Sequence, residues 1–312
     1  MKKTIALLAG GTSSEREVSL KSGQQVYQAL DKEKYEVRRY DPKTDLARLV
    51  ADAHQIDAAL IILHGPYGED GTVQGLLELL NIPYQGAGVL GSALAMNKLA
   101  AKQMYEKWGL PVPPYEVVTQ MSPADPAELT ARLGLPLVVK PVSSGSSIGM
   151  SIVHTGADLA AALEKAFEHD MDVIAEAYID GIEITAGVLG NDTLQALPLI
   201  EIIPDRQHPF FDYTAKYTPG ASQEICPARI DADATQKAQR FALRAHKALY
   251  LKGYSRTDMI LRGRDIFVLE TNTIPGMTPT SLFPQAAQAA GISFSQLLDR
   301  LIELGIQAHR QR

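Results

Sequence analysis

Short apolar runs alternate with stretches of helical periodicity along the first third of the chain. The runs at 4–9, 35–40 and 58–64 have the length and residue types of buried strands. The stretches at 14–30 and 72–80 carry apolar residues at helical spacing. Strands that alternate with helices predict a parallel sheet joined by crossover helices. We therefore expect the chain to begin with an α/β unit.

The rest of the chain contains strand-like runs that follow one another more directly. Further strands are expected at 136–140, 151–154, 172–178, 183–189, 197–203, 256–261 and 266–271. Further helices are expected at 92–108, 156–167, 234–249 and 294–305. Because several strands are consecutive, part of the later sheet should be antiparallel, which gives this region α+β character. A domain boundary is expected near residue 100, soon followed by a stiff Pro-rich connector at 109–114.

Composition and charge narrow the class of protein. The 312 residues include 30 Lys and Arg against 36 Asp and Glu, a net charge of −6, which argues against a strongly basic nucleic-acid binder. The length favours about two domains. The single cysteine, Cys226, excludes an internal disulfide or a Cys-rich zinc site and fits a reducing compartment.

The N-terminal residues resemble the start of a secretory signal, because Lys2 and Lys3 precede an apolar run. That run stops at Gly10-Gly11 and no small-residue cleavage site follows, so a first β-strand is the better interpretation. No segment approaches the ~18 apolar residues that span a membrane. We expect a cytoplasmic protein with neither a membrane nor a nucleic-acid partner.

Glycine-rich motifs separate two kinds of nucleotide site. The sequence has no Gly-Lys dipeptide, so it lacks the P-loop of Walker-type NTPases. Gly86, Gly88 and Gly91 do match the dinucleotide-binding pattern, but no strand-containing βαβ context surrounds them. A tight loop that leads into a helix is the favoured interpretation, and a nicotinamide-dependent oxidoreductase is the alternative from another class.

The segment 140–150 is a Ser- and Gly-rich loop between two expected strands, and we expect it to be the tip of a β-hairpin. Small residues let backbone N–H groups approach an anion, and Lys140 at the strand end supplies a positive charge. A solvated turn without a ligand remains the alternative.

Two strand ends carry polar residues to one edge of the expected parallel sheet. After the first strand, Ser14 and Glu17 fit a capping box. Glu15 either favours the helix N-terminus or points into the crevice where such sheets bind ligands. The segment 64–71, which begins with His64, follows an equivalent strand and reaches the same edge.

The two strands at 256–261 and 266–271 predict a cluster of carboxylates. With a three-residue loop at 263–265, Asp258 faces Glu270, Ile260 faces Val268 and Arg256 faces Asn272. Like charges this close repel, so the pair makes sense around a divalent cation such as Mg²⁺ or Mn²⁺, with the Asn272 oxygen as a further ligand. A two-residue loop would place the carboxylates on opposite faces, and a solvated edge hairpin is then the alternative.

The run between Pro204 and Pro227 has neither helical nor strand periodicity. Loops of this length are often lids over active sites, and its four aromatic residues argue against disorder. Lys216 would give such a lid a charge to place on phosphate.

Taken together, these segments resemble the D-alanine–D-alanine ligases of the ATP-grasp superfamily. The matching motifs are Gly10-Gly11-x-Ser13-x-Glu15-x-Glu17-Val18-Ser19, His64-Gly65, Gly68-Glu69-Asp70-Gly71, Lys140-Pro141, Gly145-Ser146-Ser147-x-Gly149-Met150, Asp212-Tyr213-x-Ala215-Lys216-Tyr217, Arg256-x-Asp258, Glu270-x-Asn272-x-x-Pro275-Gly276-Met277-Thr278 and Ser281-Leu282. They extend nearly from end to end of the chain, and several are specific to the ligases.

The resemblance implies an ATP-grasp fold with three parts. An N-terminal domain with a doubly wound parallel sheet would occupy 1–100 and a central ATP-grasp subdomain 101–185. A C-terminal ATP-grasp subdomain at 186–312 would carry the metal site and the lid loop 204–227. The implied activity is the ATP-dependent joining of two D-alanines through an acyl phosphate, for peptidoglycan synthesis, by a cytoplasmic homodimer.

The resemblance also implies a set of site residues. The implied ATP-binding residues are Lys98, Lys140, Ser147, Glu176, Ile179, Glu183 and Lys216. The implied catalytic and substrate-binding residues are Glu15, His64, Ser146, Tyr217, Arg256, Gly276, Ser281 and Leu282. Asp258, Glu270 and Asn272 would bind two Mg²⁺ or Mn²⁺ ions, with Glu270 between them.

Individual roles follow from the same resemblance. Glu15 would hold the ammonium of the first D-alanine, and Ser146 and Tyr217 would join it in tying down the lid. Arg256 and the Gly276 N–H would stabilise the developing oxyanion. Ser281 and the Leu282 N–H would receive the second carboxylate.

Two alternatives stay close to this family. In a D-alanine–D-lactate ligase the second substrate is a hydroxy acid, and Tyr217 in the lid argues for the amine-using enzyme. A catalytically silent ATP-binding protein is disfavoured because the metal ligands and the substrate-loop residues are all present.

Overall fold

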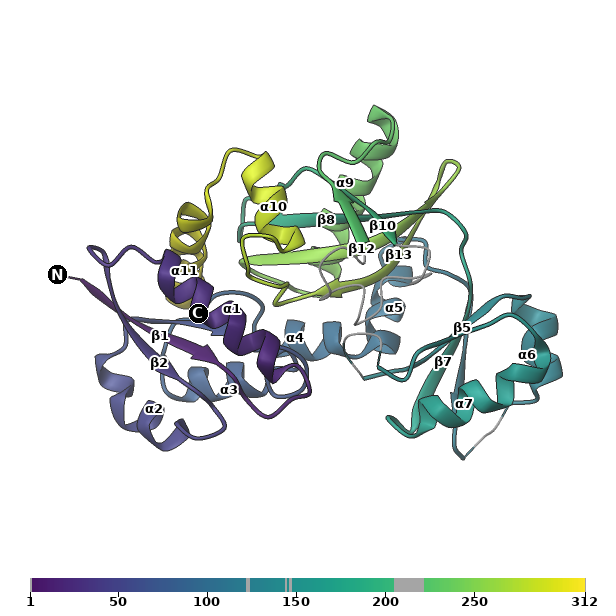
Figure 1. The fold of residues 1–312 in the computed structure, drawn as a ribbon, viewed down its shortest axis with the longest axis horizontal. Helices are drawn as coiled ribbons and strands as arrows, with labels where there is room; N and C mark the ends of the chain where they lie inside the picture. The colour runs from purple at the N-terminus through teal and green to yellow at the C-terminus, as the bar shows by residue number, and fades with distance from the viewer. Residues whose placement is uncertain (1, 122–123, 144, 146–147, 205–221, 312) are drawn as a thin grey trace.

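The computed structural model describes residues 2–121, 124–143, 145, 148–204 and 222–311. These residues form three β-sheets with helices packed on them (Figure 1). Within the described ranges, no helix is long and apolar enough to cross a bilayer.

The first sheet is parallel, as the alternation of strands and helices predicts. Its strand order is β2-β1-β3, and β1 pairs with both neighbours. The strands are β1 (Lys3–Ala9), β2 (Tyr35–Tyr40) and β3 (Ala58–Ile62). The helical segments between and after them are α1 (Arg16–Ala29), α2 (Leu46–Asp52), the 3₁₀ turn η1 (Ala53–Gln55) and α3 (Thr72–Leu79).

Both faces of this sheet are covered, so it is doubly wound. Successive strand residues point to opposite faces. Ile5 and Leu7 pack with α1 and with α11 (Phe294–Arg310), whereas Ala6 and Leu8 pack with α2 and α3. Figure 1 shows α11, from the far end of the sequence, beside this first sheet.

The second sheet is antiparallel and has the strand order β4-β7-β5-β6. Its strands are β4 (Tyr115–Thr119), β5 (Leu137–Pro141), β6 (Ser151–Val153) and β7 (Asp172–Ala177). The helical segments that accompany it are α6 (Pro126–Leu133), the 3₁₀ turn η2 (Gly156–Asp158) and α7 (Leu159–Phe167). Because β5 and β6 pair directly, the loop between them is the tip of a hairpin, as expected.

The third sheet is also antiparallel, with the order β11-β10-β8-β12-β13 and with β9 paired to β8. Its strands are β8 (Ile182–Leu189), β9 (Gln195–Ala196), β10 (Ile200–Pro204), β11 (Ser222–Ile225), β12 (Tyr254–Arg262) and β13 (Asp265–Asn272). Helix α9 (Ala232–Ala248) packs on one face of this sheet, where it buries Ile184 and Met259. Helix α10 (Leu282–Ala289) packs on the other face, where it buries Leu189 and Ile200. The antiparallel arrangement expected for the later part of the chain is therefore confirmed.

The single helix expected at 92–108 is wrong. The structure has two helices there, α4 (Val89–Met96) and α5 (Lys98–Lys107). Asn97 between them is extended, and its side-chain oxygen accepts a hydrogen bond from the Ala100 N–H at 2.8 Å. An asparagine at this position caps a new helix, which allows α5 to leave in a different direction.

The expected capping box of Ser14 and Glu17 is also wrong. Helix α1 begins at Arg16, its N-cap is Glu15, and Ser14 and Glu17 are exposed. Ser13 has the structural role instead, because its hydroxyl donates to the His64 carbonyl at 2.7 Å and accepts from the Glu15 N–H at 3.3 Å. This contact joins the ends of β1 and β3.

The glycines at 86–91 serve packing. Tyr84 before them makes only an isolated bridge with Ala59, so no strand of a dinucleotide-binding unit precedes the loop. A Cβ atom on Gly91 would lie 2.9 Å from Leu251 Cδ2 and 3.0 Å from the Leu249 carbonyl oxygen. The expectation of a tight loop that leads into a helix is confirmed by α4.

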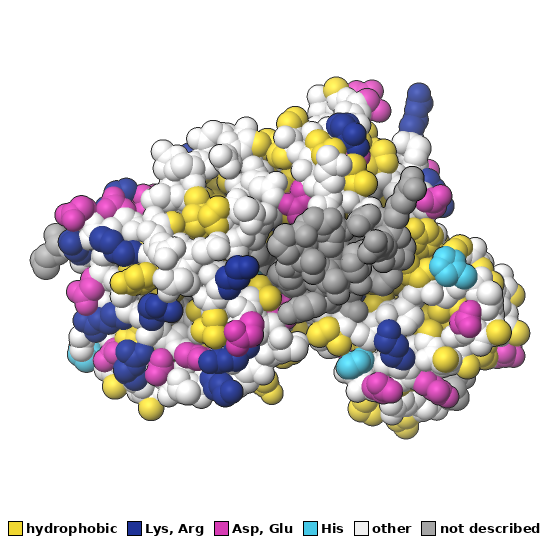
Figure 2. Space-filling view, viewed as in Figure 1, with side chains coloured by type: hydrophobic (Ala, Val, Ile, Leu, Met, Phe, Trp, Pro, Cys, Tyr) yellow, Lys and Arg dark blue, Asp and Glu magenta, His cyan; other side chains and the backbone are white. Residues whose placement is uncertain are grey.

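Charged side chains of both signs are interspersed over the described surface on the face in Figure 2. This distribution matches the small net charge of the chain, −6.

Candidate active site

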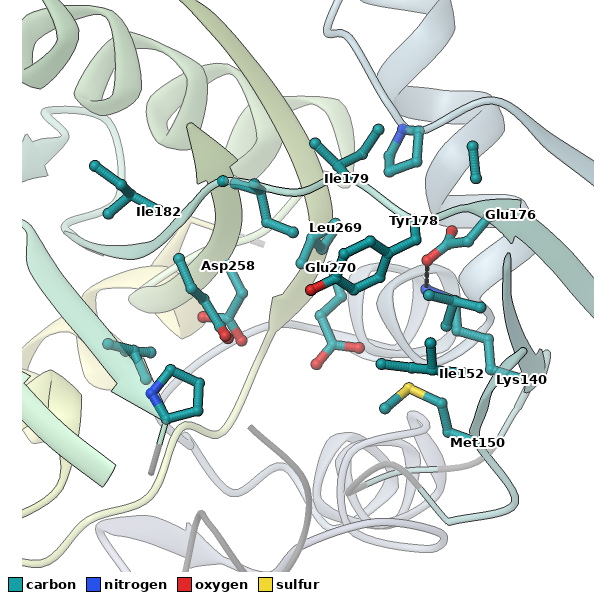
Figure 3. A pocket seen from close by; sticks show the side chains of 18 of the residues that line it. Lys140, Met150, Ile152, Glu176, Tyr178, Ile179, Ile182, Asp258, Leu269 and Glu270 are labelled. Carbon is teal, nitrogen blue, oxygen red and sulfur yellow. Dashed lines mark hydrogen bonds and ion pairs between the residues drawn. The ribbon is translucent and has the colours of Figure 1, made fainter. Parts of the chain in front are cut away.

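A cavity of about 480 Å³ lies between the two antiparallel sheets (Figure 3). Apolar side chains from both sheets form much of its wall: Val138, Met150, Ile152, Ile179, Ile182, Ile202 and Leu269. Polar side chains also line it: Lys98, Lys140, Glu176, Glu183, Glu201, Arg229, Asp258 and Glu270. An apolar slot with a few polar groups suits a planar base joined to a charged chain.

Glu176 on β7 is shared by two lysines. Lys140 Nζ, at the end of β5, lies 2.5 Å from its Oε1, and Lys102 Nζ on α5 lies 2.7 Å from its Oε2. Burial alone would raise the pKa of the Glu176 carboxyl, but the charges of Lys102 and Lys140 outweigh burial and lower this pKa well below its usual value. Burial lowers the pKa of Lys102, and the charge of Glu176 acts in the opposite direction.

Other predicted ATP-binding residues reach the same cavity. Lys98 is the first residue of α5, and its backbone N–H donates to the Val142 carbonyl at 2.9 Å, which ties the helix start to the end of the β5 segment. Ile179 lines the cavity from the connection that leads into β8, and Glu183 lines it from the start of β8. The break at Asn97 therefore makes Lys98 the first residue of α5, where it lines the cavity.

Asp258 on β12 faces Glu270 on β13, and Arg256 faces Asn272, as predicted. The predicted pair of Ile260 with Val268 is wrong, because Ile260 faces Phe267. The ladder closes from Arg262 to Asp265 around a two-residue turn, and its register shifts between Asp258 and Met259. This β-bulge adds one residue to β13 and restores the pairing that an even loop would have lost.

The Asp258 carboxylate is held by three neighbours. Arg256 donates to both oxygens, at 2.9 and 2.7 Å, and Thr185 on β8 donates to Oδ1 at 2.6 Å. The Asn272 amide nitrogen donates to Oδ2 at 3.0 Å. The side chain therefore has a fixed direction into the cavity (Figure 3).

The donor set at 258, 270 and 272 suits a hard divalent cation. It combines two carboxylates with an amide, and Mg²⁺ prefers such oxygen ligands. A carboxylate has about four acceptor positions, which Arg256, Thr185 and Asn272 largely occupy at Asp258. Turning the Asn272 amide by half a turn would free one of them and present the amide oxygen to the same space. No cluster of three His, Cys, Asp or Glu side chains suited to a metal occurs among the described residues.

A second cavity, of about 80 Å³, adjoins the first sheet. Its lining includes Glu15, His64, Glu69, Gly145, Arg256, Glu270, Asn272 and Gly276. Glu270 lines both cavities, so the two spaces meet at this carboxylate. The structure thus brings the polar edge of the parallel sheet next to the β12–β13 hairpin.

Glu15 and His64 are both buried in this second site, at 5% and 4% exposure. Burial lowers the pKa of the His64 imidazole, partly offset by the Glu15 charge, so the ring is neutral at pH 7. Its Nε2 has no hydrogen-bond partner among the described residues. A neutral ring with a free nitrogen beside a carboxylate can bind a small polar ligand.

Glu69 connects two loops that border the second cavity. It accepts hydrogen bonds from the Gly65 N–H at 2.8 Å and the Ile274 N–H at 3.3 Å. Burial and the nearby Glu15 charge raise the pKa of the Glu69 carboxyl to about 8. Glu69 is therefore mainly protonated at neutral pH.

Gly276 lines the second cavity and lies against Ser281, the N-cap residue of α10. A Cβ atom on Gly276 would lie 3.0 Å from Ser281 Oγ. Ser281 Oγ accepts from the Thr278 N–H at 3.1 Å, and Leu282 begins the helix. Ser281 and Leu282 are not part of the lining itself.

Several predicted residues lie outside the described part of the chain. These are Ser146, Ser147, Lys216 and Tyr217, together with most of the predicted lid at 204–227. A Cβ atom added at Gly145, which is described, would lie only 3.2 Å from Oε2 of Glu15, the N-cap residue of α1. The hairpin tip therefore reaches Glu15.

Sequence reasoning missed several side chains of the site, among them Lys102, Glu69 and Thr185. Lys102 follows Lys98 by one helical turn, which is the signal that could have found it. Glu69 belongs to the motif Gly68-Glu69-Asp70-Gly71, but neither the sequence nor the resemblance predicted a role for it. Thr185 shows no signal in the sequence, because its contact depends on β8 lying beside β12.

Both halves of the chain match protein-family models. Residues 104–303 match the model described as D-ala D-ala ligase C-terminus, and residues 4–47 and 38–87 match the model described as D-ala D-ala ligase N-terminus.

Similar proteins carry the same description. A D-alanine–D-alanine ligase of Syntrophobacter fumaroxidans is 66% identical over 98% of this chain and 98% of its own length. One of Desulfotalea psychrophila is 56% identical over 97% of this chain and 95% of its own.

Solved structures show the same fold. The D-alanine–D-alanine ligase of Bacillus anthracis complexed with ATP superposes with a TM-score of 0.87 at 37% identity, and covers 99% of both chains. The VanG D-Ala:D-Ser ligase of Enterococcus faecalis superposes with a TM-score of 0.83 at 35% identity, and covers 98% of this chain and 100% of its own.

Proposed function

This chain belongs to the D-alanine–D-alanine ligase family, and we propose that it joins two D-alanines at the expense of ATP for peptidoglycan synthesis. The observation that carries the proposal is the position of Glu270 in both cavities. A phosphate donor in the larger cavity and a small acceptor in the smaller one would meet at this residue.

The larger cavity is the proposed ATP site. The apolar slot would take adenine, with Glu176 and the backbone at Ile179 at its edge and Glu183 near the ribose. Lys98 and Lys140 would bind phosphates, because both line the same cavity and carry positive charge. Ser147 and Lys216 are proposed from the resemblance alone.

Asp258, Glu270 and Asn272 are the proposed ligands of two Mg²⁺ or Mn²⁺ ions. Bound there, the ions would neutralise charge on the phosphates during transfer. Arg256 orients the Asp258 carboxylate through its two hydrogen bonds.

The smaller cavity is the proposed site of the first D-alanine. Its ammonium would pair with Glu15, which is buried there, and the neutral His64 ring would donate or accept one hydrogen bond. Ser146 and Tyr217 are proposed to complete this set. The neighbouring Gly145 supports this proposal, because a Cβ atom added there would lie 3.2 Å from Glu15 Oε2.

The proposed reaction has two steps. A carboxylate is a poor electrophile, so the γ-phosphoryl group of ATP is first transferred to a carboxylate oxygen of the first D-alanine, which gives an acyl phosphate and ADP. The amine of the second D-alanine then attacks the acyl carbon, and inorganic phosphate leaves from the tetrahedral intermediate. Both steps concentrate negative charge, which explains the convergence of lysines and an arginine.

Arg256 and the Gly276 N–H are proposed to stabilise the tetrahedral oxyanion, since both line the smaller cavity. Ser281 and the Leu282 N–H are proposed to receive the carboxylate of the second D-alanine. Ser281 lies next to Gly276, at the start of α10, where helix N–H groups favour an anion.

Phosphate release from ATP tests the proposal. We expect release that depends on D-alanine, one dipeptide per phosphate, and no release with L-alanine. Release that is independent of D-alanine, or oxidation of NADH, would contradict it.

Equimolar D-alanine and D-lactate at pH 7 test the second substrate. A tyrosine phenol at position 217 is uncharged and would tolerate the ammonium of D-alanine, so D-alanyl-D-alanine should be nearly the sole product. Predominant depsipeptide would identify the D-lactate-type ligase instead.

We also propose a cytoplasmic homodimer with three domains at about 1–100, 101–185 and 186–312. Light scattering coupled to gel filtration should give twice the mass of the chain, and a monomer would contradict the dimer. Limited proteolysis should cut between the proposed domains.

A further inference from the structure

Lys102 is a charged side chain that the proposed reaction does not use. It lies on α5, its side chain is 0% exposed, and it is absent from the lining of the nucleotide cavity. Its ammonium has Glu176 on one side, at 2.7 Å, and the Tyr115 ring on another, 5.2 Å from the ring centroid. A buried ammonium is costly unless a structural or functional gain offsets it.

The contacts of Glu176 indicate what that gain is. Lys102 and Lys140 contact different oxygens of the carboxylate, so they do not compete for one position. Only Lys140 of the two also lines the cavity. The three side chains together carry one net positive charge, and the lysine that faces the cavity is the one able to present it.

Without Lys102, Glu176 would have Lys140 as its one remaining partner in this cluster. A carboxylate that is 3% exposed would then retain the Lys140 ammonium, because separating the pair would leave a buried charge uncompensated. The remaining pair of Glu176 and Lys140 would have no net charge with which to attract a phosphate. A lysine held in this way would bind an anion weakly.

We propose that Lys102 is a positioning residue, which acts as the permanent counter-ion of Glu176 and so leaves Lys140 available to the phosphates of the nucleotide. This inference rests on the proposed ATP site. It predicts that Lys102 affects nucleotides according to their phosphates, although it touches no part of the cavity.

The Lys102→Met variant tests this dependence. A methionine of similar length fills the space without the charge. Calorimetric titration should show ADP bound roughly ten- to a hundredfold more weakly, the range expected for losing one charge-assisted contact. Adenosine, which has no phosphate, should bind within about threefold of wild type.

In steady-state kinetics, Lys102→Met should affect the KM for ATP and not the KM for D-alanine. The KM for ATP should rise by a similar factor, whereas the KM for D-alanine should change by less than about threefold. Lys107→Met is the matched control, because Lys107 is an exposed lysine on the same helix. It should leave all of these values unchanged.

If Lys102→Met is unstable, a double variant still tests the role of Lys102. In Lys102→Met/Glu176→Gln the carboxylate charge is removed as well, so Lys140 is released again. Its ADP affinity should return to within about threefold of the Glu176→Gln single variant, with a normal thermal unfolding transition.

Three results would overturn the inference: unchanged ADP affinity in Lys102→Met, equal losses for adenosine and ADP, or no recovery in the double variant. Failure of the proposed function looks different. In that case the wild type releases no phosphate with D-alanine, while its ADP titrations still decide the role of Lys102.

Discussion

Asp258 and Glu270 face each other across β12 and β13 because Leu269 is an extra residue in the second strand. Below this bulge the ladder pairs Met259 with Val268 and continues in register to the turn. The bulge therefore sets two carboxylates side by side at the point where the two cavities meet.

Glu270→Gln should abolish turnover and leave the fold intact. The substitution keeps the shape of the side chain but removes the charge that the proposed cations share, so we expect kcat to fall at least about a hundredfold. Phosphate release at saturating Mg²⁺ measures the effect. Asp265→Asn, at the exposed end of the same strand, is the control. A normal rate for Glu270→Gln would refute the metal assignment.

Glu69→Gln should flatten the dependence of stability on pH. Burial and Glu15 raise the pKa of Glu69 to about 8 in the folded protein, above its ordinary value of 4.5. Between these values the folded state holds more protons than the unfolded state, so its stability falls as pH rises. Urea unfolding from pH 4.5 to 8.5 should show this decline in wild type relative to the variant. Parallel curves for the two proteins would contradict the prediction.

His246→Gln should remove a pH dependence of stability that has the opposite sign to that of Glu69. Burial lowers the pKa of His246 from 6.5 to about 4, and its Nδ1 lies 2.8 Å from Ser255 Oγ. The unfolded state then binds more protons between pH 6.5 and 4, so acid destabilises the wild type. Relative to the variant, wild type should lose about 3 kcal/mol of unfolding free energy across that window. Unfolding curves at pH 4, 5, 6 and 7 measure this, and a constant difference would exclude His246 as the cause.

Two helical glycines should respond in opposite ways to alanine. At Gly91 a Cβ atom would lie 2.9 Å from Leu251, so Gly91→Ala should destabilise the protein by roughly 1–3 kcal/mol. At Gly75 the nearest atom is 3.8 Å away, so Gly75→Ala should be neutral or stabilise by up to about 1 kcal/mol. Thermal unfolding of both variants measures the contrast. Equal shifts in the two would show that packing at Gly91 is not decisive.

The hairpin shows how far the sequence determines the site. The spacing of charged and apolar residues predicted the facing carboxylates, but through a three-residue loop. The structure reaches the same pair through a two-residue turn and a bulge. Register depends on parity, and a bulge changes parity without a mark in the hydrophobic pattern.

Local propensity also explains what was missed. The apolar pattern of 92–108 continues through Asn97, so it predicted one helix, whereas the cap at Asn97 starts a second. Lys102 follows the same helical pattern and resembles a surface lysine in sequence. Its burial depends on Glu176, 74 positions away, which periodicity within one helix cannot reveal.

The packing of α11 against the first sheet has a consequence for biosynthesis. Ile5 and Leu7 share one apolar cluster with Leu297, Leu298 and Leu301. A ribosome releases the strands of this sheet long before residues 294–310 emerge. The part of this face that α1 does not cover therefore stays exposed through most of translation, and the part made early completes its core only when this late helix arrives.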